Sequence, residues 1–397
     1  MPVGRPLIWL PLTLVEFQLP TMDRRNFLKY VTLAGSSFAL TSCIQGRRNS
    51  QLQSDVTPTA SPVVVNEPLK VGFVYLGPVG DFGWTYAHDL GRREMEANLQ
   101  DKVKTTFIEN VSEADAERVI RQLAVDGSKL IFTTSLSYMN ATMKVAKEFP
   151  QVIFEHCTGS QLAANVGTYS GRFEEPRYLT GMIAGKMTKS NIIGFIGAYP
   201  IPEVIRGINA FTLGLRTTNP QAKVRVLWVQ NWYHPAKERE TAQALINLGA
   251  DVLTQHTDST AAMQLAAAKG IYAFGYNSDM SSFGAKAHLT SAINKWGKFY
   301  IDTALAVMNN TWKPQQTWSG IAQGMVDISP MNQAIPSDVQ QLVNAKREQF
   351  IQGTAHPFDG PIKDQKGVVR VPKGKALDDQ LQEKMDWYVQ GIEGSIP

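Results

Sequence analysis

An aspartate and two aromatic side chains stand among three glycines in the segment GPVGDFGW, residues 77–84. The Asp81 carboxylate can accept hydrogen bonds from a ligand, and such a bond contributes about 1.5–3 kcal/mol. Phe82 and Trp84 offer flat faces, and each ring stack adds roughly 0.5–1.5 kcal/mol beyond area burial. This set suits a neutral planar ligand that carries N–H or O–H donors. The alternative left open by the residues is that the rings fill a helix–sheet core and Asp81 caps a helix.

The same segment does not fit a phosphate-binding loop. Its glycines are spaced G-x-x-G-x-x-G, which is neither the dinucleotide fingerprint nor a Walker loop, and no Lys-Ser/Thr pair follows. Asp81 also places negative charge where a phosphate requires positive potential. We therefore expect no nucleotide cofactor, and nothing else in the sequence calls for a cofactor.

The sequence lacks the residue patterns of common hydrolases. It contains no G-x-S-x-G elbow, and none of its six histidines is spaced to pair with a serine or cysteine. A nucleoside hydrolase needs clustered aspartates for a metal ion, and the first loop provides one aspartate. His156 and Cys157 are adjacent, but no further His/Cys cluster follows a ligand spacing. The sequence therefore predicts a binding protein without a metal site, not an enzyme.

Short apolar runs rich in β-branched residues alternate with longer amphipathic segments after Pro68. This alternation predicts an α/β fold with mostly parallel sheets flanked by helices. The expected strands are LKVGFVYL, KLIFTTS, QVIFEHC, NIIGFIGAY, KVRVLWVQ, ADVLTQH and GIYAFGYN.

Two of the intervening segments carry clear helix signals. In DSTAAMQLAAAKG we expect Asp258 to cap the helix and Gly270 to follow its last turn. In HPAKERETAQALINLG we expect Pro235 in the first turn and Gly249 as the stop.

The strand–helix units are too many for one compact sheet domain, so we expect two lobes. Residues 68–172 form the first lobe, residues 173–290 the second, and residues 291–397 cross back to complete both. Ligands bind beyond the carboxyl ends of the strands in such sheets. The segment 77–84 follows a strand and should face the cleft. Ser135, which ends KLIFTTS, is a candidate by the same rule, with backbone capping as an equal alternative.

The first 67 residues read as export and tethering segments. From Met22, the sequence MDRRNFLKYVTLAGSSFALTSC resembles a twin-arginine signal followed by a lipobox, and its apolar run is too short to span a bilayer. We expect a signal peptide at 22–42, lipidation of Cys43 and a flexible tether at 43–67, preceded by an upstream extension at 1–21. The alternative is a chance basic start with a stray cysteine. The predicted protein is held by lipid at the periplasmic or extracytoplasmic face of the cytoplasmic membrane.

The overall charge excludes one class of partner. The chain of 397 residues carries 39 Lys and Arg against 35 Asp and Glu, a formal charge of +4. Part of this excess lies in the predicted signal segment, and the remainder is scattered. We therefore expect no nucleic-acid partner.

Three longer segments resemble the basic membrane protein family, which comprises substrate-binding lipoproteins of ABC transporters related to purine nucleoside receptors. They are VGFVYLGPVGDFGWTYAHDLGRREME, YLTGMIAGKMTKSNIIGFIGAYPIPEVIRGINAFTLGLRTTNP and GYNSDMSSFGAKAHLTSAINKWGKFY. The resemblance implies a type I periplasmic-binding fold whose two lobes enclose the ligand. It implies a purine-type small molecule as ligand and an ABC permease as partner.

The resemblance also implies ligand contacts from both lobes. Asp81 matches a first-loop aspartate that reads the base. Asp279 matches an aspartate that holds ribose hydroxyls in nucleoside binders, with Gly275 and Asn277 in the same turn. For Asp279 the alternative is an N-cap for a helix that starts near Ser281.

Three further residues follow from the same resemblance. Asn294 stands where nucleoside receptors place a lysine, which argues against a ribose-bearing ligand. Trp296 offers another flat face beside it, and Trp232 is the candidate for the ring opposite the first loop. Two other functions share these features: a ligand-sensing partner of a membrane signalling protein, and a sugar-binding receptor of the same fold.

Overall fold

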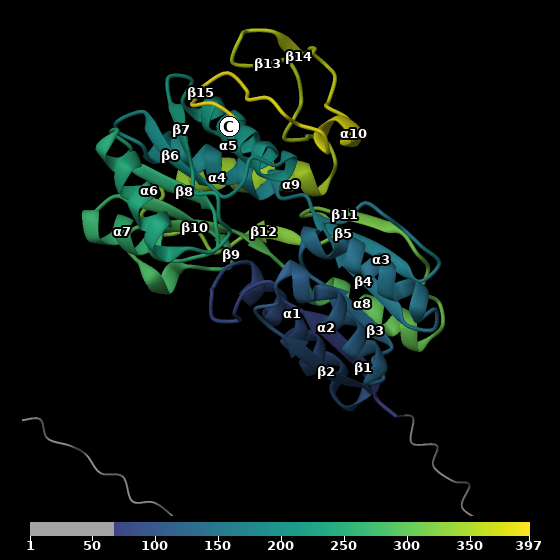
Figure 1. Ribbon diagram of the computed structural model, residues 1–397. Helices are drawn as coiled ribbons and strands as arrows, with labels where there is room; N and C mark the ends of the chain where they lie inside the picture. Colours follow the sequence, from purple (N-terminus) through teal and green to yellow (C-terminus); the bar gives the residue numbers. More distant parts are fainter. Residues whose placement is uncertain (1–66) are drawn as a thin grey trace, which may run out of the picture. The chain divides into compact units, whose positions relative to one another are not determined.

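The computed structural model describes residues 67–397 (Figure 1). The predicted upstream extension, signal peptide, lipidated Cys43 and nearly all of the tether lie outside the described residues. No helix among residues 67–397 combines the length and apolar character needed to cross a membrane.

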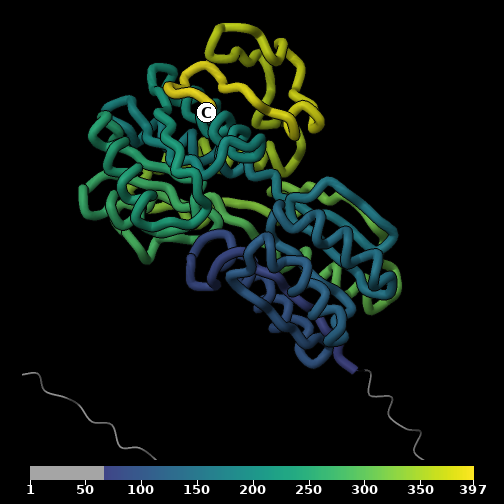
Figure 2. The backbone as a smooth tube through the Cα atoms, viewed as in Figure 1, coloured from purple at the N-terminus to yellow at the C-terminus, as the bar shows by residue number. Residues whose placement is uncertain are grey.

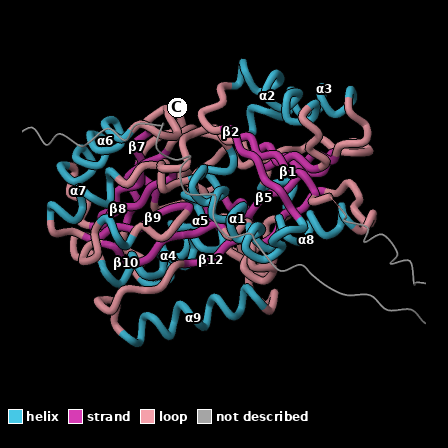
Figure 3. Tube along the Cα trace, turned by 90° about the horizontal axis from the view of Figure 1, so that it is seen from below, coloured by secondary structure: helices cyan, strands magenta, loops and turns pink. Residues whose placement is uncertain are grey.

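The first lobe is built on a six-stranded parallel sheet in the order β11-β5-β4-β3-β1-β2. Helices α2 and α3 cover one face through a core that includes Ile120, Val145 and Phe154, and α1 and α8 cover the other (Figure 3). The strands are β1 (Leu69–Val74), β2 (Val103–Ile108), β3 (Leu130–Thr133), β4 (Ile153–Cys157), β5 (Val166–Gly171) and β11 (Gln316–Ser319). The helices are α1 (Trp84–Leu99), α2 (Glu113–Val125), α3 (Met139–Glu148) and α8 (Gly297–Met308).

The second lobe has a seven-stranded sheet in the order β12-β10-β9-β8-β6-β7-β15, in which only β12 runs antiparallel to its neighbour. Helices α4 and α5 cover one face, and α6 and α7 cover the other. The strands are β6 (Ile192–Gly197), β7 (Lys223–Trp228), β8 (Val252–His256), β9 (Tyr272–Asn277), β10 (His288–Asn294), β12 (Val326–Ile328) and β15 (Ile392–Glu393). The helices are α4 (Glu174–Met187), α5 (Pro202–Thr218), α6 (Pro235–Asn247), α7 (Ala261–Lys269) and α9 (Ser337–Ile351), which packs on α4.

Three chain segments connect the lobes. They run from β5 to α4, from β10 to α8 and from β11 to β12. Three adjacent connections allow a hinge motion, since a few residues in each can absorb the change in backbone angles.

The last forty residues form a cap on the second lobe, seen as the yellow end of the tube in Figure 2. The cap contains β13 (Ile362–Lys363), β14 (Val369–Val371) and α10 (Asp379–Gln382) before β15 joins the sheet edge. Asn209 of α5 donates to the Trp387 carbonyl at 2.7 Å. Asp379 accepts two hydrogen bonds from the Arg172 guanidinium, at 2.9 and 2.6 Å, next to the first connection between the lobes.

The predicted α/β fold is confirmed, and all seven expected strands are present. Pro235 starts α6, Gly249 follows it with φ +97°, and Gly270 ends α7 with φ +67°, as predicted. The prediction that Asp258 caps α7 was wrong. Thr260 occupies the cap position, and the Asp258 carboxylate bonds elsewhere.

Candidate functional site

A cavity of about 500 Å³ lies at the carboxyl ends of strands from both sheets. The first lobe contributes residues that follow β1, β2, β3 and β4, and the second lobe contributes residues at or just after the ends of β6, β7, β8 and β9. This is where open parallel sheets bind ligands. Its lining is Leu76, Trp84, Glu113, Thr134, Ser135, Leu136, Ser137, Thr158, Tyr199, Pro200, Ile201, Glu203, Trp232, His256, Asp258, Tyr276 and Asn277.

The glycine-rich loop is shaped by Asp81, which is buried beneath it. One carboxylate oxygen accepts from the backbone N–H of Gly83 at 2.8 Å and of Tyr86 at 3.0 Å, and the other from Thr85 at 3.2 Å. These bonds satisfy donors that the first turn of α1 leaves free. Burial nevertheless raises the pKa of Asp81 to about 6, and the backbone hydrogen bonds oppose that rise. Asp81 therefore holds the loop and does not line the cavity.

Trp84 is fixed at the first position of α1 by two hydrogen bonds. Its indole N–H donates to the Thr134 carbonyl at 2.6 Å, within the first lobe. Its backbone N–H donates to Asp258 Oδ1 of the second lobe at 3.2 Å. Fully buried Trp296 meets the indole edge-on at 5.7 Å and stacks on His88 at 4.8 Å. The hydrogen bond to Thr134 and the contact with Trp296 thus fix the orientation of the Trp84 indole, which lines the cavity.

Asp258 anchors a chain of polar side chains in the second lobe. Asn277 donates to Asp258 Oδ1 at 2.8 Å, and Asn294 donates to Asn277 Oδ1 at 2.8 Å. Asn277 ends β9 in the left-handed region, with φ +67°, which asparagine tolerates. Burial and the nearby carboxylates of Asp81 and Glu238 raise the pKa of Asp258. The chain sets the orientation of Asn277, whose side chain reaches the cavity.

A second polar group surrounds His256 at the end of β8. The Tyr276 hydroxyl lies 2.8 Å from His256 Nε2, and Glu203 Oε1 of α5 lies 3.6 Å from the same atom. Burial lowers the pKa of His256 to about 4, so the imidazole is neutral near pH 7. Trp232 and Tyr199 lie beside this group, with ring centroids 5.3 Å apart.

Four of the ten predicted ligand-binding residues line the cavity: Trp84, Ser135, Trp232 and Asn277. The other six lie outside its lining. Asp81 and Asn294 hold lining elements in place, as described above, and Trp296 is wholly buried behind Trp84.

The remaining three predicted residues have structural contacts. Phe82 adopts φ +61°, packs edge-on against Phe283 of the second lobe at 4.6 Å, and its carbonyl accepts from Ser278. The Asp279 carboxylate accepts from the Ser281 N–H at 2.9 Å. A Cβ on Gly275 would lie 2.1 Å from the Ser291 hydroxyl, so this position requires glycine for packing.

Sequence reasoning missed several lining residues, above all Asp258 and Glu203. Asp258 comes two residues after a predicted strand, so the carboxyl-end rule that selected Ser135 selects it too. Glu203, in the first turn of α5, carries no such signal because it follows Pro202 in an ordinary helix start.

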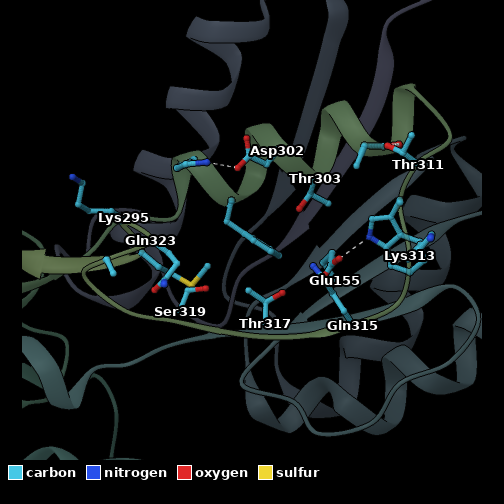
Figure 4. A pocket seen from close by; sticks show the side chains of 17 residues that line it. Glu155, Lys295, Asp302, Thr303, Thr311, Lys313, Gln315, Thr317, Ser319 and Gln323 are labelled. Atoms are coloured by element: carbon cyan, nitrogen blue, oxygen red, sulfur yellow. Dashed lines mark hydrogen bonds and ion pairs between the residues drawn. The ribbon is translucent and has the colours of Figure 1, made fainter. Parts of the chain in front are cut away.

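A second cavity, of about 620 Å³, lies within the first lobe between α8 and the segment 311–325 (Figure 4). Glu155 of β4 lines this cavity and accepts a hydrogen bond from the Trp312 indole at 2.8 Å. Burial raises the pKa of Glu155 to about 8. Lys295, Lys298 and Lys313 line this cavity. Lys295 follows β10 and is its one lining residue from the carboxyl end of a second-lobe strand, whereas the cavity between the lobes receives residues from four of them. The geometry of the binding fold therefore favours the cavity between the lobes as the functional site.

Two lobes of mostly parallel sheet, joined by three connections around a cavity, define a periplasmic-binding protein of type I. A family model described as "ABC transporter substrate-binding protein PnrA-like" matches residues 69–357, and the chain belongs to this family. It is thus a substrate-binding protein of an ABC transporter, a solute receptor and not an enzyme.

Two relatives cover most of the chain. It is 50% identical over 332 residues to a purine-binding protein of Brucella abortus. The matched residues make up 83% of this chain and 95% of the relative. It is 36% identical over 331 residues to a putative ABC transporter glucose-binding protein of Haloferax volcanii, covering 83% and 82%.

Two solved structures show the same fold. An ABC transporter solute-binding protein from Conexibacter woesei has a TM-score of 0.61 and 23% identity, covering 72% of this chain and 98% of that one. One from Aeropyrum pernix K1 has a TM-score of 0.64 and 17% identity, covering 80% and 96%.

Proposed function

We propose that the protein captures a purine-type small molecule between its lobes and delivers it to an ABC permease. The observation that carries this proposal is that one cavity is lined by Trp84 from the first lobe and Trp232 from the second. Flat faces from both lobes suit a planar heterocycle, and a ligand that touches both lobes stabilises their closed arrangement. The name of the Brucella abortus relative supports the same ligand class.

The lining supplies hydrogen-bond acceptors around these rings. Asp258, Glu203 and Asn277 approach from the second lobe, while Ser135 and Thr134 approach from the first. We assign ligand contact to Trp84, Trp232, Ser135 and Asn277 among the residues predicted from the sequence. We assign supporting roles to Asp81, Phe82, Asn294 and Trp296, which hold the loop, the ring and the amide in place. Gly275 and Asp279 shape the turn around Asn277.

The predicted anchor completes the proposal. A lipid on Cys43 would hold the folded body at the extracytoplasmic membrane surface through the tether 43–67, close to the permease. Opening and closing about the three connections would let the permease distinguish loaded from empty receptor.

A sugar is the second candidate ligand. The Haloferax volcanii relative is named as a putative glucose-binding protein, and aromatic faces also stack on sugar rings. Calorimetric titration with hypoxanthine, guanosine and glucose separates the candidates. Binding of hypoxanthine or guanosine with no heat from glucose supports the proposal, and binding of glucose alone refutes it.

A further inference from the structure

The cavity between the lobes has an unbalanced charge. Three carboxyl side chains line it, those of Glu113, Glu203 and Asp258, and its described lining contains no lysine or arginine. Glu113 is exposed at the rim, whereas Asp258 is buried and Glu203 is 18% exposed. These two inner side chains therefore lie where water screens charge least.

Two arginines lie near this lining without entering it, and both act electrostatically on His256. Arg177 is wholly buried behind Tyr276, with its guanidinium 3.8 Å from the ring centre, and it donates to the Gln255 carbonyl at 2.6 Å. Arg206 pairs with Glu174 at 3.1 Å. His256 is neutral near pH 7 because its burial lowers its pKa to about 4.

Both inner carboxyl groups keep acceptor capacity for a ligand. Asp258 uses Oδ1 for Trp84 and Asn277, and no donor from residues 67–397 reaches Oδ2. The ionic contact that Glu203 makes within residues 67–397 is with the His256 ring, 3.6 Å away. Glu203 lies in the first turn of α5, and a helix N-terminus attracts negative charge.

We propose that Glu203 selects purines by charge. Its carboxylate accepts hydrogen bonds from the N–H edge of neutral or protonated purines, and it excludes purine anions such as urate and purine nucleotides. This selection rests on the proposed function, because it presumes that purines bind in this cavity. Like charges placed together across an interface cost several kcal/mol, so urate should bind roughly 100-fold more weakly than hypoxanthine.

The test compares hypoxanthine with urate, which is an anion near neutral pH, by calorimetric titration of the full-length protein. Glu203→Gln removes one charge but keeps an acceptor oxygen. Glu240→Gln, on the exposed face of α6, removes the same charge away from the cavity and serves as the matched control. The affinity for urate relative to that for hypoxanthine should rise about tenfold in Glu203→Gln and stay unchanged in the control.

The outcomes separate the two proposals. Equal affinity of wild-type protein for hypoxanthine and urate, or an affinity ratio that Glu203→Gln does not change, overturns charge selection while purine binding stands. Binding of no purine at all overturns the proposed function and the selection with it. The comparison of the two ligands on wild-type protein decides even if Glu203→Gln fails to fold.

Discussion

A single methyl group at Gly83 should interfere with closure of the two lobes. An added Cβ would lie 2.4 Å from the Asp258 carbonyl oxygen and 2.6 Å from its Cα, across the contact between the lobes. Real Cβ atoms do not approach this closely, so the loop or the β8 end must shift. Forced overpacking costs about 1–3 kcal/mol. The cost arises only when the lobes meet, so Gly83→Ala should weaken ligand affinity by roughly 5- to 150-fold.

The control for this variant lies in the same loop. A Cβ on Gly80 would have no atom within 4 Å, so Gly80→Ala should bind as wild type does. Affinity is measured by titration with the purine that binds wild-type protein, and stability by thermal unfolding without ligand. Gly83→Ala binding as tightly as Gly80→Ala would refute the claim that this contact closes the site. Equal losses in both variants would point to the loop's general flexibility instead.

Three further predictions concern other parts of the chain. Trp84→Ala should reduce ligand affinity at least tenfold, since a lost stack and its buried area together exceed about 1.4 kcal/mol. The control, Trp312→Ala in the second cavity, should not reduce ligand affinity. Unchanged affinity in Trp84→Ala excludes the indole from the site. The pKa of Glu155 is about 8 in the folded protein and 4.5 when the side chain is exposed. Its contribution to the free energy of unfolding is therefore fully present below about pH 4.5 and is lost as the pH rises to about 8. The loss is at most about 5 kcal/mol. Glu155→Gln should remove this slope in urea unfolding at about pH 5 and about pH 8, and an equal effect of the variant at both pH values would contradict it. Cys43→Ala should move the protein from the membrane to the soluble fraction, and continued membrane retention would count against a lipid on this residue.

The fold was readable from the sequence because its strands are apolar and its helices carry clear end signals. The buried runs at β1, β3, β4 and β6 stand out in this way. Two of the strands that were not predicted, β2 and β10, have a different burial pattern. Edge strand β2 exposes most of VKTTFI, and β10 buries the polar residues of HLTSAIN. A pattern based on hydrophobicity detects neither.

The site was only half readable, for a physical reason. The carboxyl-end rule places loops at the cavity but does not say which side chain of a loop faces it. Asp81 and Asp258 show the difficulty, since each stands in a polar loop after a strand. Asp81 accepts hydrogen bonds from backbone N–H groups at the start of α1, whereas Asp258 accepts one from the Trp84 N–H of the other lobe. Which carboxylate meets a ligand depends on these tertiary contacts, which local sequence does not encode.

The proposed function requires that a purine-type molecule occupies the cavity between the lobes. The most direct measurement purifies the protein natively, denatures it, and identifies the released small molecule by mass spectrometry. The same preparation of Trp84→Ala serves as the comparison. We expect a purine base or nucleoside to be released from wild-type protein and at most a trace from the variant. A sugar released from wild-type protein, or a purine retained equally by Trp84→Ala, would contradict it.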